Sequence, residues 1–198
     1  MNILAIYEKY AKDIAPFFPA SANIDFLLML LELKPSMRTR CVAEKDMQKS
    51  VVEWLKENGF YAWIDHENYI YISSIQSTLE KVIALDTSTE KQESKIGELF
   101  GYPRCCCKKI QGIGEEQIDA YEEAISQEIF PLFFKLIDPK NYRKGTAFIS
   151  HVPCSTNCFD SLALAQQFGF FIHKNKHSLL FSGWVKELDK IYGALICH

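Results

Sequence analysis

The stretch FYAWIDHENYIYI, residues 60–72, decides the fold class of this chain. Its two halves, residues 60–64 and 69–72, are rich in aromatic and β-branched residues, and the polar sequence His66-Glu67-Asn68 lies between them. Two runs of this composition around a short polar connection are typical of a β-hairpin. This hairpin is the clearest strand signal in the chain, so we expect any sheet to be small.

Helical patterns surround the hairpin on both sides. Apolar residues at helical spacing, with proline and glycine as stop signals, predict most of the secondary structure. The expected helices cover residues 3–14, 23–33, 44–57, 77–85, a segment restarting at Pro103, 115–137 with a bend at Pro131, 155–171 and 178–195. Residues 146–149 are a further strand candidate. The predicted class is α+β and mostly helical, with helices around a small β-hairpin or antiparallel sheet.

The length of 198 residues suits one domain, or one domain with a small N-terminal subdomain. A polar, charged stretch from residue 86 to 95 is the candidate boundary. We therefore expect a helix-hairpin-helix subdomain in residues 1–85 and a helical region with the cysteine site in residues 86–198. The two can also form one continuous domain, and the chain is long enough to bury a core without disulfides.

The composition narrows the functional class. The net charge is −3 and the pI is about 6.0, so no basic face indicates nucleic-acid binding. No run approaches the ~18 consecutive apolar residues of a membrane span. The N-terminus lacks the pattern of a secretory signal, so we expect a cytoplasmic protein. No motif names a small-molecule or protein substrate, and the oligomeric state stays open.

Seven cysteines are many for such a chain. In a reducing compartment they are poor candidates for structural disulfides. The odd number, with three adjacent cysteines at positions 105–107, also makes a poor disulfide framework. Metal binding and thiol catalysis are the remaining reasons to cluster them.

Two short segments place proline just before cysteines: GYPRCCC at residues 101–107 and HVPCSTNC at residues 151–158. Both are expected where a helix begins. A helix start offers free N–H groups and partial positive charge, so we expect lowered thiol pKa values there. The thiolate is the form that binds metals and attacks electrophiles. We expect the segments to meet in one site composed of Cys105, Cys106, His151, Cys154 and Cys158.

A metal centre is the leading hypothesis for this site. Cys154 and Cys158 face one point if they lie one helical turn apart. With Cys105 and Cys106 they supply four sulfur ligands, which suit an iron–sulfur cluster or a tetrahedral zinc ion. The excess of sulfur places iron–sulfur ahead of zinc, with a role in redox or sulfur-related chemistry. His151 is then a fifth ligand, a proton donor or a partner behind the ligands.

Thiol chemistry without a metal is the first alternative. A cysteine beside a histidine is the minimal unit of nucleophilic catalysis, with Cys106 or Cys105 as nucleophile and His151 as base. Whether the protein is an enzyme therefore stays open. Cys41 and Cys197 are interpreted as small core residues, and Cys107 is ambiguous between core and site.

A zinc-stabilised binding module is the second alternative. The zinc would hold the two cysteine segments together and have no other role. The hairpin would then contact a partner through exposed aromatic side chains, namely Tyr61, Trp63, Tyr69 and Tyr71.

The two segments resemble the signature of an uncharacterised prokaryotic domain-of-unknown-function family. That signature reads Gly-Tyr-Pro-x-Cys-Cys and, later, His-x-Pro-Cys-Ser-x-x-Cys-x-x-Ser. The matching residues are Gly101, Tyr102, Pro103, Cys105, Cys106, His151, Pro153, Cys154, Ser155, Cys158 and Ser161. The family pattern has an apolar residue in place of Cys107. The resemblance implies one common site and names no reaction.

Overall fold

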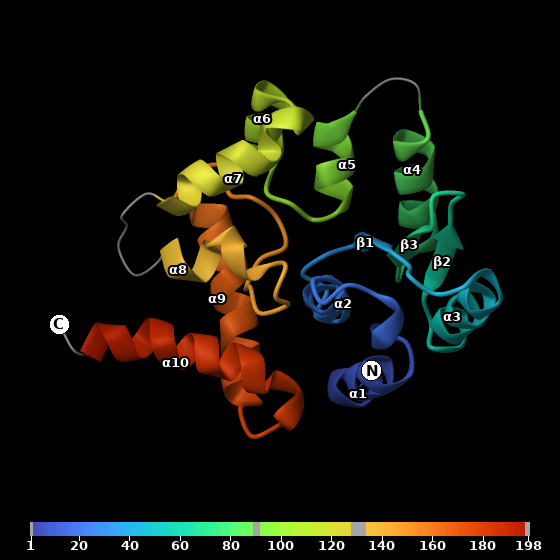
Figure 1. Cartoon of the computed structure of the whole chain (residues 1–198), viewed down its shortest axis with the longest axis horizontal. Coiled ribbons are helices and arrows are strands. Elements are labelled where there is room, and N and C mark those ends of the chain that lie inside the picture. Colours follow the sequence, from blue (N-terminus) through green and yellow to red (C-terminus); the bar gives the residue numbers. More distant parts are fainter. Residues whose placement is uncertain (1, 89–91, 128–133, 197–198) are drawn as a thin grey trace.

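The computed structural model describes residues 2–88, 92–127 and 134–196, and it shows the expected mostly helical α+β fold (Figure 1). The N-terminal elements are α1 (Ile3–Asp13), η1 (Ala15–Phe17), α2 (Ala22–Leu30), β1 (Ser36–Arg40), α3 (Lys45–Glu57), β2 (Tyr61–Ile64), β3 (Tyr69–Ser73) and α4 (Gln76–Asp86). The later elements are α5 (Glu93–Leu99), α6 (Arg104–Ile113), η2 (Glu115–Gln117), α7 (Ile118–Gln127), α8 (Phe134–Ile137), η3 (Pro139–Asn141), α9 (Phe159–Lys174), η4 (Leu179–Phe181) and α10 (Ser182–Ile196).

The predicted hairpin is confirmed as β2 and β3, and a further strand extends it into a small sheet. The strand order is β1-β3-β2, and both pairings are antiparallel. β1 was not predicted, because its residues SMRTR are mostly polar and show no aromatic or β-branched enrichment. Arg38 is accommodated in this strand because its guanidinium lies 4.2 Å from the centre of the Tyr69 ring and pairs with Asp86.

The central strand β3 packs against other elements on both faces of the sheet. Successive side chains of a strand point to opposite sides, so its residues alternate between two hydrophobic clusters. Ile70 and Ile72 belong to the larger core, together with residues of α2 and α3. Tyr71 belongs to a second, smaller cluster with Leu79 and Val82 of α4. Figure 1 shows α3 and α4 around the sheet, α5 beside α4, and α6 to α10 farther from the sheet.

The larger core continues into the C-terminal part, through Phe148, Phe168 and Trp184 among others. It crosses the expected boundary near residue 86, and the division into two parts stays a prediction. Residues 146–149 were predicted as a strand, and this was wrong: they form no ladder. The segment is a buried connection instead, and Trp184 Nε1 donates a hydrogen bond to the carbonyl of Ala147 at 2.9 Å.

Helix starts differ from the sequence prediction at three places, since the helix expected from residue 115 begins as η2 and continues as α7. The helix expected from residue 155 begins at Phe159, because residues 155–157 form turns. The helix expected from residue 178 divides into η4 and α10. The bend expected at Pro131 lies outside the described residues.

A buried ion pair joins α2 to the segment before β1. Lys34 Nζ contacts Asp25 Oδ1, and both side chains are almost completely inaccessible. The remaining groups around the pair are satisfied: Lys34 also donates to Ser150 Oγ at 2.8 Å, and Tyr142 Oη donates to Asp25 Oδ2 at 2.7 Å. Burial lowers the pKa of Lys34, and the Asp25 carboxylate opposes that shift. The pair therefore connects the N-terminal helices to residues 142–150.

Gly101 packs against the backbone at Lys34 and Pro35. This close contact explains why the motif at residues 101–107 begins with glycine. Its φ of +75° is in the left-handed region, and a Cβ there would stand 2.9 Å from Pro35 Cδ and 3.1 Å from Lys34 Cα. Only glycine fits this close approach.

Within residues 2–88, 92–127 and 134–196, no helix combines the length and the apolar character that crossing a membrane requires.

We predict that Asp25→Asn destabilises the protein by about 3–5 kcal/mol, because it leaves the Lys34 ammonium buried without its counter-charge. Urea unfolding followed by circular dichroism measures the change. The matched control is Asp119→Asn, which removes the same charge from an exposed pair with Arg143. Solvent screens that pair, so we expect a small fraction of the Asp25 effect. Equal losses in both variants would contradict a special role for the buried pair.

Candidate metal centre

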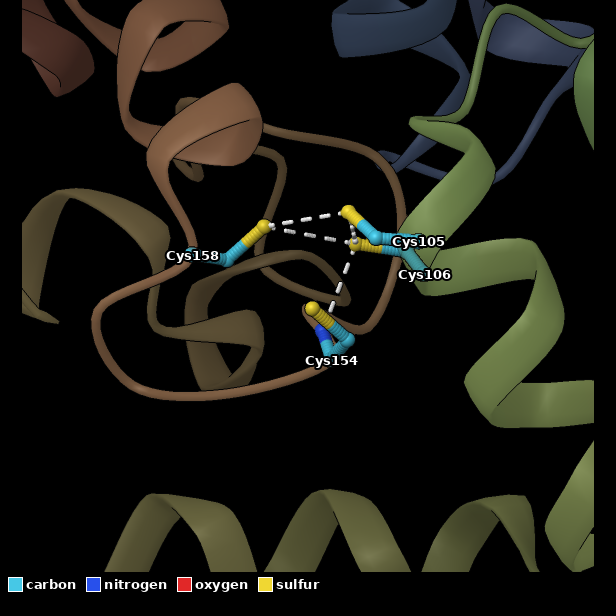
Figure 2. Close-up of side chains that lie close together, drawn as sticks. All are labelled: Cys105, Cys106, Cys154 and Cys158. Carbon is cyan, nitrogen blue, oxygen red and sulfur yellow. Dashed lines mark hydrogen bonds between the residues drawn. The ribbon is translucent and has the colours of Figure 1, made fainter.

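The structure brings four cysteines from two distant segments together (Figure 2). The Sγ atoms of Cys105, Cys106, Cys154 and Cys158 all lie within 4.8 Å of one another. Cys105 and Cys106 come from the first turn of α6, and Cys154 and Cys158 come from the loop that leads into α9. This confirms that the two segments meet, although they are 53 residues apart when measured from Cys105 to Cys158.

Three of the four sulfurs are nearly equally spaced. The Sγ–Sγ distance is 3.6 Å from Cys105 to Cys158, 3.7 Å from Cys106 to Cys158 and 3.9 Å from Cys105 to Cys106. Cys106 and Cys158 are buried, whereas Cys105 and Cys154 are partly exposed. One side of the cluster is therefore accessible, and there Cys105 Sγ lies 3.6 Å from the carboxylate of Asp160.

The first segment positions two adjacent thiols on one helix start. Pro103 is the N-cap of α6, and its carbonyl accepts the first helical hydrogen bond from the N–H of Cys107. Neighbouring residues of a regular helix point about 100° apart. The Sγ atoms of Cys105 and Cys106 nevertheless converge to 3.9 Å in this first turn.

The second segment differs from its predicted form. Cys154 and Cys158 were expected one turn apart on a single helix, but Cys154 lies in a loop and Cys158 is the N-cap of α9. The hydroxyl of Ser155, in the same loop, donates a hydrogen bond to Asn157 Oδ1. The loop is held from α7, where Tyr121 Oη donates to the carbonyl of Cys154 at 2.8 Å. The backbone N–H of Cys154 in turn donates to Cys106 Sγ at 3.3 Å.

Ser161 is the polar centre of the buried side of the cluster. Its hydroxyl is completely inaccessible and lies 3.2 Å from Cys158 Sγ and 3.4 Å from Cys106 Sγ. His151 Nε2 stands 2.8 Å from the same hydroxyl. His151 is therefore next to the sulfurs but one hydrogen bond behind them, and it is not part of the set of mutually close ligand atoms. Its role as ligand or base stays a prediction.

The thiols differ in their acidity, contrary to the expectation that both helix starts lower it. Burial, with hydrogen bonds to Cys158 and Cys154, raises the pKa of Cys105 to about 12. Burial also raises the pKa of Cys106 far above its ordinary value, although Ser161 and the N–H of Cys154 oppose the shift. For Cys158 burial acts in the same direction, but donors outweigh it, Ser161 first among them, and its pKa falls to about 7.

His151 is uncharged at neutral pH in this environment. Burial, and then the positive charge of Lys34, lower its pKa to about 3. Its ring packs against that of Tyr102 at a tilt of 34°, with the ring centres 5.3 Å apart. Tyr102 in turn lies under the Lys34 ammonium, 4.8 Å from the ring centre. The buried ion pair therefore adjoins the site through Tyr102.

The other sequence candidates lie apart from the cluster. Cys107 is buried in a contact with α5, where a Cβ on Gly97 would stand 2.8 Å from its sulfur. Cys41 is a core residue, as predicted, and Cys197 lies outside the described residues. His66, His173 and His177 are exposed. Sequence reasoning missed Lys34, Tyr121 and Asp160, which lie in no motif, whereas Ser161 appears in the family signature.

No protein-family model matches this chain, and no curated protein and no solved structure matches it either. The chemistry of the site must therefore be argued from its own geometry.

We predict that Ser161→Ala raises the pKa of Cys158 above about 7 in the metal-free protein, because the thiolate loses its hydroxyl donor. The thiolate fraction of Cys158 at pH 7 should fall. The pH dependence of its alkylation, followed peptide by peptide by mass spectrometry, measures this. Ser155→Ala is the matched control, because the Ser155 hydroxyl contacts Asn157 and no sulfur. An unmoved Cys158, or an equal shift in the control, would refute the assignment.

Proposed function

We propose that the protein binds a metal through the thiolates of Cys105, Cys106, Cys154 and Cys158, and that this centre serves redox or sulfur-related chemistry. One observation carries the proposal: four sulfur atoms from two distant segments lie within 4.8 Å of one another. Four thiolates at such distances repel one another, and a bound cation offsets that repulsion.

The sulfur spacing supports a single ion over a cluster. Around a tetrahedral zinc, with Zn–S bonds of about 2.3 Å, neighbouring sulfurs stand about 3.8 Å apart. The three distances from 3.6 to 3.9 Å agree with that value. In an iron–sulfur cluster the four cysteines are divided among two or four irons, and sulfurs on different irons stand farther apart. We therefore place a single zinc or iron ion first and the iron–sulfur cluster second.

The extent of the core favours a functional role for the metal over a structural one. The larger hydrophobic cluster contains residues from α1 to α10, and the site cysteines Cys106 and Cys158 are only two of its many buried members. Structural zinc is needed chiefly where a small domain lacks such a core. A redox role requires iron, because zinc has no redox chemistry. A cytoplasmic location suits the proposal, since thiols stay reduced there.

The two alternatives receive less support from the geometry. For a thiol enzyme with Cys106 as nucleophile, His151 would have to face that sulfur, yet its Nε2 faces Ser161. Cys106 is also 1% exposed. For a binding module, the hairpin would have to expose its aromatic residues. Tyr61 and Trp63 are exposed, but Tyr71 is buried and Tyr69 is half-buried, so that part of the prediction was wrong.

We predict that protein purified without oxygen carries one metal ion per chain. Elemental analysis, visible absorption and an assay for inorganic sulfide identify it: zinc leaves the protein colourless, a single thiolate-bound iron colours it without sulfide, and a cluster brings both colour and sulfide. Cys158→Ser should lose most of the metal. Cys107→Ser is the matched control and should keep it, because its sulfur lies outside the cluster. Metal-free wild-type protein with four readily alkylated thiols would refute the proposal.

We also predict that removing the metal with a chelator leaves the protein folded. The far-ultraviolet circular dichroism should be retained and thermal unfolding should stay cooperative, at a lower Tm, because the core lies mostly outside the site. Loss of the helical signal on chelation, as in domains that fold only with zinc, would instead favour the zinc-stabilised module.

A further inference from the structure

A cavity of about 210 Å³ reaches the buried side of the cysteine cluster. It lies between α5, α6 and residues 150–152, and Cys106, Tyr102 and His151 are among the residues that line it. The metal set uses neither Tyr102 nor His151, although both belong to the signature segments. Both residues line this one cavity.

Tyr102 and His151 each bring an unused hydrogen-bonding atom to this region. Within the described part of the chain, neither Tyr102 Oη nor His151 Nδ1 makes a hydrogen bond. The fully buried polar side-chain atoms that lack a partner are Tyr10 Oη, Arg38 Nε and Gln92 Oε1. Tyr102 Oη and His151 Nδ1 are not in that group, so both atoms keep some solvent-accessible surface.

The hydrogen bonds around Ser161 decide which nitrogen of His151 carries the proton. The Ser161 hydroxyl donates to Cys158 Sγ, so it can only accept from His151. Nε2 therefore carries the proton of the neutral imidazole, and Nδ1 is left as an acceptor. A ligand in the cavity must then offer an N–H or O–H group to His151, and Tyr102 Oη can donate or accept beside it.

The charge around the cavity disfavours an anion. Among the described residues that line it, Glu93 is the charged side chain, and no lysine or arginine is present. Lys34 lies behind Tyr102, but its charge is paired with Asp25. A second hollow of about 250 Å³ borders the other side of residues 150–152. Its Arg143 is paired with Asp119, and Glu122 lies beside it.

We propose that the cavity binds a small organic molecule that is uncharged or cationic, with an N–H or O–H group for His151, and holds it beside Cys106. The apolar wall, which includes Ile110, Ile118 and Val152, suits a flat or aliphatic body. The volume is below the roughly 300 Å³ at which drug-sized pockets begin, so the molecule is small. Binding itself does not require the metal; a reaction of the molecule at the centre rests on the proposed function.

The test uses three flat molecules of nearly equal size and different charge: benzamide, benzamidine and benzoate. Each is titrated into the full-length, metal-loaded protein, with calorimetry or ligand-observed NMR as the readout. We expect benzamide and benzamidine to bind, because both donate N–H groups, and benzoate to bind at least tenfold more weakly. Benzoate that binds as tightly as benzamide would overturn the charge argument, and absence of binding by all three would overturn the site.

Two variants locate the binding. Tyr102→Phe keeps the ring against His151 and removes one hydroxyl, so we expect two- to tenfold weaker benzamide binding, about the worth of one hydrogen bond. Val152→Phe fills the cavity and should abolish binding. Tyr61→Phe, on the exposed hairpin, is the matched control and should change nothing. Unaltered binding in Tyr102→Phe and in a folded Val152→Phe protein would refute the assignment.

Metal content is measured on the same samples. Protein that carries metal but binds none of the three molecules would contradict only the cavity proposal. Protein without metal that binds benzamide in the expected way would contradict only the proposed function.

Discussion

The buried ion pair between Lys34 and Asp25 is the constraint on which the site depends. Two charges removed from water are tolerated only when each is fully satisfied, and here Ser150, Tyr142 and the Tyr102 ring complete their surroundings. These partners come from the 142–150 segment and from the loop before α6. Satisfying one buried charge therefore fixes both chain segments that carry the cysteines, and the close approach of Gly101 to Lys34 follows from the same packing.

The cysteine cluster presents a second electrostatic problem. Burial raises the pKa of Cys105 and of Cys106, whereas hydrogen-bond donors, Ser161 first among them, lower the pKa of Cys158. Metal binding must displace the thiol protons, so the affinity of the site is linked to pH. Ser161 joins the sulfurs to His151, and this bond sets the orientation of an imidazole that is not itself among the close ligand atoms. Such partners behind the ligands commonly tune a metal site.

The two sides of the cluster differ in character. On one side, Cys105 and Asp160 are accessible to solvent. On the other, Cys106 and Ser161 are buried, and a small cavity begins beyond Cys106. Solvent therefore reaches the cluster from one side, and the cavity reaches it from the other.

The sequence by itself determined the helical α+β class, the hairpin and the membership of the four cysteines in one site, because periodicity and rare residues in fixed order are local signals. It did not reveal β1, whose polar residues form a strand only because β3 offers a pairing edge. It placed Cys154 and Cys158 on one helix, but the contact of Tyr121 with the loop and the late start of α9 decided otherwise. It expected acidic thiols at both helix starts, and burial, which depends on distant residues, reversed that for Cys105 and Cys106. Lys34, lying in no motif, became part of the site only through tertiary packing, since no local pattern encodes which groups meet in a core.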